Sequence, residues 1–154
     1  MSSEPVLRVQ VNPEAFAVDA DRLEQAVRHV LAREGVGEGE VSLTLLADPA
    51  MQDLNRRWLA HDRTTDVLSF ALQGDGEPLL GDVYVGWEQA ERQSAEHGVP
   101  LAEELVRLAV HGTLHLLGHD HPDAADERPG SPFFQRQETL VTECLEKGAD
   151  HGRA

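Results

Sequence analysis

Apolar side chains along this chain follow two periods, and the shorter period predicts four strands. Residues 6–11 and 40–47 alternate between apolar and polar positions, as a strand with one buried face does. Residues 67–70 and 79–86 are richer in Val, Leu, Phe and Tyr, and a loop with Gly74, Gly76 and Pro78 separates them. We therefore expect four short strands, with the last two arranged like a hairpin.

The longer period predicts helices between and after these strands. After Asp19, a good helix cap, apolar residues recur at helical spacing: Leu23, Ala26, Val27, Val30 and Leu31. We expect a short helix from Pro49 capped by Asp48, a polar helix over 87–97 ended by Gly98, and an amphipathic helix over 133–145. A further helix begins at Pro100, and its apolar positions surround most of its circumference, which predicts a central place in the fold.

These elements predict an α+β domain. We expect one mixed four-stranded sheet, helices packed mainly on one of its faces, and a candidate metal site at the end of the central helix. The 154 residues suffice for a single domain with a proper core, and we expect the last six or so residues to be frayed.

The central helix leads into the segment richest in chemistry, residues 111–121, which contains four of the eight histidines. His111 and His115 are four residues apart, so both rings project from one face of a helix. His121 is too far along for the same straight helix, so the chain must turn back, and Gly118 suits such a helix end. Three neutral imidazoles that leave a fourth position open for water are typical of a catalytic zinc site.

The same spacing occurs in metzincin proteases, with one difference. Those enzymes carry their general base, a glutamate, directly after the first histidine, where this chain has Gly112. Peptide hydrolysis is therefore disfavoured, and the sequence offers no evident general base. His119 is either a fourth ligand or a residue facing solvent or substrate, and Asp120 either orients a ligand histidine or caps the turn.

Composition limits the setting. The net charge of −15 argues against a general grip on nucleic acid, although twelve of the thirteen basic residues are arginine, which suits local phosphate contacts. A lone cysteine, Cys144, excludes an internal disulfide, and neither a secretory signal nor a membrane-length apolar run is present. We expect a cytoplasmic protein without membrane contact.

A second polar segment precedes the third predicted strand. Arg57 and Arg63 are candidates for contacts with substrate phosphates, and Asp66 and Ser69 are candidates for lining a cleft. A solvated loop, with Asp66 and Ser69 only capping the turn and strand, is the alternative.

Two motifs together resemble the YbeY family of bacterial metal-dependent endoribonucleases. They are Thr-Asp-Val-Leu-Ser-Phe at 65–70 and His-Gly-x-Leu-His-Leu-Leu-Gly-x-Asp-His at 111–121, and the similarity covers roughly residues 40–145. The resemblance implies one metal ion, usually zinc, held by His111, His115 and His121. It also implies single-stranded RNA as substrate, including the 3′ end of small-subunit ribosomal RNA, with a role in ribosome quality control and partners among ribosomal proteins or ribosome-associated factors.

Two departures from the family pattern and two alternatives stay open. Many members of that family have an arginine where this chain has Leu59, and members often have a tyrosine where this chain has His119. The alternatives are a metal-dependent hydrolase of another substrate and a non-catalytic, ribosome-associated metal-binding factor.

Overall fold

A mixed sheet of four strands forms the base of the computed structural model, which describes residues 5–59, 66–118 and 130–151. The order across the sheet is β1-β2-β4-β3, and the bounds are Leu7–Asn12 for β1, Gly39–Leu46 for β2, Val67–Ala71 for β3 and Leu79–Gly86 for β4. The first three neighbours in this order run parallel, whereas β3 and β4 form the antiparallel hairpin that the loop glycines predicted. The predicted fold class is confirmed.

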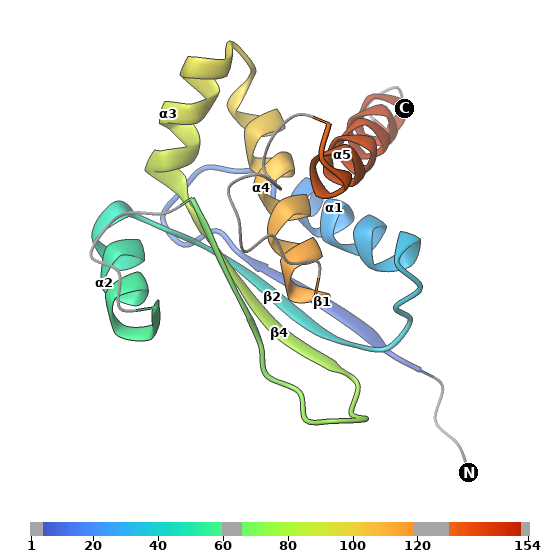
Figure 1. Cartoon of the computed structure of the whole chain (residues 1–154). Coiled ribbons are helices and arrows are strands. Elements are labelled where there is room, and N and C mark those ends of the chain that lie inside the picture. Colours follow the sequence, from blue (N-terminus) through green and yellow to red (C-terminus); the bar gives the residue numbers. More distant parts are fainter. Residues whose placement is uncertain (1–4, 60–65, 119–129, 152–154) are drawn as a thin grey trace.

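Alternation along the strands explains why helices cover one face. In β2 the side chains of Val41, Leu43 and Leu45 are buried, while Glu40, directly before Val41, is exposed. β4 continues the pattern with buried Val83 and Val85. Figure 1 shows α1, α4 and α5 on one side of the sheet, whereas α2 lies apart from them at the left and packs against β4 and α3.

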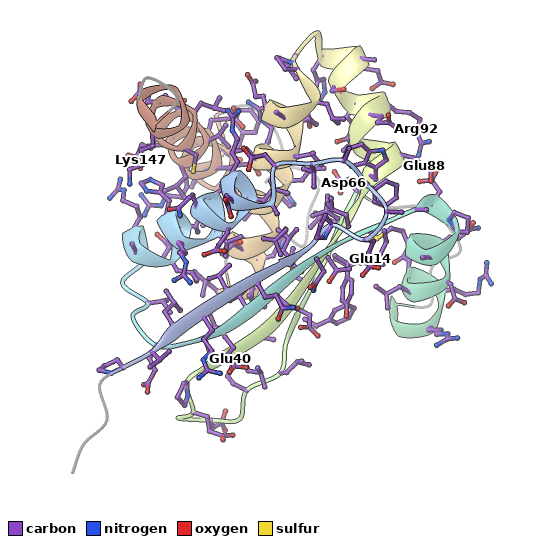
Figure 2. All side chains as sticks on the ribbon, turned by 180° about the vertical axis from the view of Figure 1, so that it is seen from behind. Glu14, Glu40, Asp66, Glu88, Arg92 and Lys147 are labelled. Atoms are coloured by element: carbon purple, nitrogen blue, oxygen red, sulfur yellow. The ribbon has the colours of Figure 1, made fainter. Side chains whose placement is uncertain are left out.

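Part of the opposite face of the sheet, over β1, β2 and the middle of β4, is polar. Ser42 of β2 donates a hydrogen bond of 2.7 Å to the Asp82 carboxylate of β4, and Glu40 pairs loosely with Arg8 of β1. Glu40 is labelled on this side of the ribbon in Figure 2.

The first helix, α1 (Ala20–Arg33), forms as its sequence pattern indicates. The Asp19 carboxylate accepts the Arg22 backbone N–H at 3.1 Å, a cap typically worth about 1 kcal/mol. All five apolar residues of the predicted stripe are buried: Leu23, Ala26, Val27, Val30 and Leu31. Because α1 links β1 to the parallel strand β2, it must cross back over the sheet, which places it in the covering layer.

Four further helices complete the described part of the chain: α2 (Asp48–Leu59), α3 (Trp87–His97), α4 (Leu101–Leu116) and α5 (Pro132–His151). α3 ends at Gly98 in the left-handed conformation, as predicted. α5 extends beyond its predicted end at Leu145, and α2 includes Asp48 itself.

The link between α2 and α3 explains the start of α2. The Glu88 carboxylate accepts the Asp48 backbone N–H at 2.7 Å, and Arg92 pairs with the Asp48 carboxylate at 2.9 Å. Figure 2 shows Glu88 and Arg92 of α3 next to the beginning of α2. A partner from another helix therefore anchors the first turn that the sequence assigned to Asp48 alone.

Candidate functional site

The histidine pair lies in the last turns of α4, the most buried helix of the fold. α4 packs against α1, α3 and α5 and against strands β3 and β4, so its direction is fixed from several sides. The ring centroids of His111 and His115 are 4.6 Å apart, with an angle of 58° between the ring planes. This short distance shows that the two rings share one face of the helix, as their spacing predicted, and both rings are partly exposed.

The opposite side of this turn touches the sheet. A Cβ atom added at Gly112 would lie 2.6 Å from Val83 Cγ1 and 2.8 Å from Val67 Cγ2, so only glycine fits between α4 and the strands here. The Ser69 hydroxyl donates a hydrogen bond of 2.7 Å to the Gly112 carbonyl oxygen. Ser69, a candidate for lining a cleft, thus links α4, the helix of the two histidines, to β3.

The first turns of α5 cover the histidines from the other side. The Phe133 ring lies 5.2 Å from the His111 ring and 5.1 Å from the His115 ring, measured between centroids. One turn later, the Gln137 side-chain oxygen lies 2.6 Å from His111 Nδ1. Gln137 is buried, with only 7% of its surface exposed. The site is therefore built from α4 and α5 together.

Gln137 also contacts an ion pair between Arg107 and Glu138. Arg107 Nε and Nη2 donate to the two Glu138 oxygens at 2.9 and 3.0 Å, and Gln137 Nε2 donates to Glu138 at 3.1 Å. Burial by itself raises the pKa of Glu138, but the hydrogen bonds from Arg107 and Gln137 outweigh it, so the pKa is lowered overall. The same hydrogen bond with Glu138 raises the pKa of Arg107. Both groups are charged at neutral pH.

The helix ends where the glycine predicted. Gly118 has a positive φ of 92°, and its N–H donates to the His115 carbonyl oxygen at 3.0 Å. The chain therefore leaves the helix axis directly after the pair, as a third ligand would require. His119, Asp120 and His121 themselves lie outside the described residues, so the third ligand stays a prediction. Among residues 5–59, 66–118 and 130–151, no group of three or more potential ligand side chains comes together.

The remaining candidate residues lie elsewhere. Arg57 is exposed on α2, which packs against β4 and α3, and its Nε pairs with Asp53 at 3.2 Å. Asp66 links the start of β3 to α3 and to the end of β4. Its carboxylate accepts a hydrogen bond from Gln93 at 3.3 Å, and its carbonyl oxygen accepts one from the Gly86 N–H at 2.9 Å. Arg63 lies outside the described residues. Thus Ser69 contacts the histidine helix, whereas the described contacts of Arg57 and Asp66 are with other elements.

Sequence reasoning missed Gln137 and Phe133. The signal was present: Phe133, Gln137, Leu140 and Val141 recur at helical spacing, so Gln137 is a polar residue within an apolar stripe. A buried polar side chain needs a hydrogen-bond partner, and here that partner is His111.

The donor set suits one transition-metal ion. Two imidazoles on successive helical turns, with the His111 ring fixed by a hydrogen bond at Nδ1, match the way proteins present histidine ligands. In metal-dependent hydrolases, such ligands sit at the end of a rigid element with part of the ion's surroundings open to substrate.

Comparisons with known proteins identify the family to which the chain belongs. The sequence model of the family described as "Endoribonuclease YbeY" matches residues 8–144. This chain belongs to the YbeY endoribonuclease family.

Relatives span most of the chain. It is 50% identical over 131 residues to Endoribonuclease YbeY of Moorella thermoacetica, covering 77% of this chain and 82% of that protein. Endoribonuclease YbeY of Geobacillus thermodenitrificans is 40% identical over 141 residues, covering 84% and 88%. The solution structure of TM1509 from Thermotoga maritima has a TM-score of 0.63 at 24% identity, covering 95% of this chain and 93% of that chain, and it supports the fold alone. Within the described residues, the helices are too short or too polar to cross a membrane.

Proposed function

We propose that this protein is a single-strand-specific, metal-dependent endoribonuclease that acts in ribosomal RNA maturation, including the 3′ end of the small-subunit RNA, and in ribosome quality control. The observation that carries the proposal is the His111–His115 pair at the end of α4, with ring centroids 4.6 Å apart. Membership of the YbeY family supplies the reaction class. The cytoplasm, where ribosomes and their associated proteins are found, is the proposed location.

In this proposal His111, His115 and His121 hold one zinc ion. When bound, the ion would lower the pKa of a water molecule and offset negative charge on the scissile phosphate. The chain's own contribution is orientation: α4 fixes the spacing of His111 and His115, and Phe133 covers one side of both rings with an apolar surface. Such a surface excludes water from that side and directs substrate to the other.

The nucleophile distinguishes two versions of the reaction. In the first, water attacks the phosphate, and the chain supplies no assigned general base. In the second, the 2′-hydroxyl of the RNA attacks the neighbouring phosphate. A product ending in a 2′,3′-cyclic phosphate would contradict attack by water, and mass spectrometry of the cleaved RNA would detect it.

Arg57 and Arg63 are the proposed phosphate contacts, because arginine offers two parallel donors to a phosphate group. Arg57 already pairs with Asp53 at an exposed position, so RNA would have to compete with that carboxylate. An exposed pair of this kind contributes about 0.2–1 kcal/mol, which a phosphate contact can offset.

The deciding experiment measures metal content and RNA cleavage on the same preparation. We would compare wild type with His115→Ala, using single-stranded RNA with and without a chelator. One bound metal, with cleavage lost in both the variant and the chelated protein, would establish the activity. Bound metal with cleavage unchanged in the variant would point to a contaminating nuclease, and would favour a metal that only stabilises the fold.

A further inference from the structure

Gln137 lies where it can decide which nitrogen of His111 faces a metal. Its side-chain oxygen is 2.6 Å from His111 Nδ1, and the side chain is 7% exposed. An amide alone leaves the direction of this hydrogen bond open, because its oxygen and nitrogen ends look alike and imidazole has two tautomers. The neighbouring charges remove that ambiguity.

The assignment starts from Arg107, which can only donate hydrogen bonds. Arg107 donates to both oxygens of Glu138, so the ionised Glu138 carboxylate can only accept. The Gln137 group that lies 3.1 Å from Glu138 must therefore be the NH₂ end. That orientation turns the Gln137 oxygen toward His111, and a hydrogen bond at 2.6 Å then requires the His111 ring proton on Nδ1.

We propose that Gln137 is a positioning residue for the metal site: it holds His111 as the Nδ1–H tautomer, so that Nε2 carries the lone pair that binds the ion. This inference rests on the proposed function, because it concerns the same His111, His115 and His121 site. Gln137 does not touch the ion or the substrate in this role. It acts through the orientation and tautomer of its neighbour, as second partners of histidine ligands do in metalloproteins.

The amide also sets the charge of the site. A carboxylate at the same place would bring a negative charge against the ring and raise the basicity of the ligand. Gln137 is neutral, and the charge of Glu138 behind it is balanced by Arg107. The histidine is therefore fixed in direction without an additional negative charge next to the ion.

The test compares Gln137→Leu with two other variants. Gln137→Leu keeps the size and burial of the side chain but removes the acceptor. Gln137→Glu restores an acceptor for Nδ1–H. Gln135→Leu is the matched control, because Gln135 is exposed on the same helix, and its amide donates to the Gly130 carbonyl oxygen, away from the histidines.

Two readouts are independent of RNA cleavage. The first is the tautomer of His111 in metal-free protein, read from long-range proton–nitrogen NMR correlations of ¹⁵N-histidine. The second is zinc affinity, measured by competition with a chromophoric chelator. In Gln137→Leu we expect a mixture of tautomers and zinc binding weakened roughly 10- to 100-fold, with Gln137→Glu recovering most of the affinity. Gln135→Leu should match wild type in both.

An unchanged tautomer and unchanged zinc affinity in Gln137→Leu would overturn the inference, whether or not the variant cleaves RNA. If Gln137→Leu fails to fold by circular dichroism, the comparison of Gln137→Glu with wild type decides. A well-folded Gln137→Glu with zinc affinity as weak as that of a His111→Ala variant would then overturn it. Wild type that binds zinc through the Nδ1–H tautomer without cleaving RNA would contradict the proposed function and leave this inference standing.

Discussion

The two ends of α5 each hold a histidine of a neighbouring helix, and they hold it in opposite ways. Near the C-terminal end, the Glu143 carboxylate lies 2.6 Å from His29 Nε2 and the Lys147 ammonium lies 2.8 Å from His29 Nδ1. Near the N-terminal end, the uncharged Gln137 lies 2.6 Å from His111 Nδ1. Figure 2 shows Lys147 on α5, next to α1.

The partners, rather than the histidine itself, decide what each ring can do. Lys147 only donates, so the lone pair of His29 Nδ1 is occupied and the ring proton on Nε2 is donated to Glu143. Both ring nitrogens of His29 are therefore used in contacts that link α1 to α5. The His111 proton lies on the side of α5, so its lone pair points away from that helix. The helix α5 therefore holds one histidine, His29, in a structural contact and another, His111, in the candidate metal site.

The largest expected difference is between His111→Ala and His29→Ala. His111→Ala should lose bound zinc and RNA cleavage by more than about 100-fold, because loss of a ligand should exceed the cost of losing a residue behind a ligand. His29→Ala should keep both, with a lower melting temperature. Elemental analysis, cleavage of single-stranded RNA and thermal unfolding would check this. Equal loss of zinc in both variants would mean that the two ends of α5 are not distinct.

The next effect concerns how the histidine helix meets the sheet. Gly112→Ala would push a methyl group against Val83 and Val67, and we expect a loss of about 1–3 kcal/mol in the free energy of unfolding. Gly37→Ala is the control, because a Cβ there meets nothing within 4 Å and should change stability by less than about 0.5 kcal/mol. Urea unfolding of both variants measures the difference, and equal midpoints would show that α4 can move away from the strands without cost.

A smaller effect is the pH dependence of the His29 end. Hydrogen bonds from Arg33 and then His29 lower the pKa of Glu143 to about 2, against about 4.3 for an unperturbed glutamate. Because the folded pKa is the lower one, this stabilisation is complete above about pH 5 and is lost as the pH falls toward 2.

The variant Glu143→Gln lacks this contribution, so its difference from wild type should shrink between pH 5 and pH 2. We expect roughly 0.5–1 kcal/mol at neutral pH, since the group is partly exposed to solvent. Urea midpoints at several pH values measure it, with Glu146→Gln, an exposed glutamate on the same helix, as control. A constant difference across this range would contradict the assignment.

The last comparison concerns chemical labelling of Cys144, beside Glu143. Burial, the main cause, raises the pKa of the Cys144 thiol to about 11. Alkylation by iodoacetamide at pH 8 should therefore be about 100-fold slower in the folded protein than in urea. The rate should not depend on chelator, because the cysteine lies at the end of α5 remote from the His111 contact. Faster labelling after metal removal would show that the two ends are coupled.

The sequence predicted the elements better than their arrangement. Alternation in 40–47 and the helical stripe after Asp19 are local, so they located β2 and α1 within a residue or so. The order β1-β2-β4-β3 depends on which strands pair across long stretches of chain, and no local pattern encodes it. The start of α2 depends on Glu88, forty residues away, for the same reason.

The candidate site likewise has features that local sequence predicts and features that depend on long-range packing. His111 and His115 could be found because their spacing is a property of one helix, and Gly118 because a positive φ favours glycine. Gln137 is 26 residues from His111, and only the packing of α5 on α4 brings them together. Ser69 was identified as a candidate, but its hydrogen bond to the Gly112 carbonyl could not be read from sequence.

The close approach at Gly112 also limits what this scaffold can become. In metzincin proteases the residue after the first histidine is the catalytic glutamate. Here the direction that a side chain would take at position 112 is filled by Val83 and Val67, on the side of α4 opposite to Phe133. Replacing Gly112 by glutamate would bury a carboxylate against the sheet rather than present it to a substrate. Directed evolution toward peptide hydrolysis would have to introduce its base from another segment of the chain.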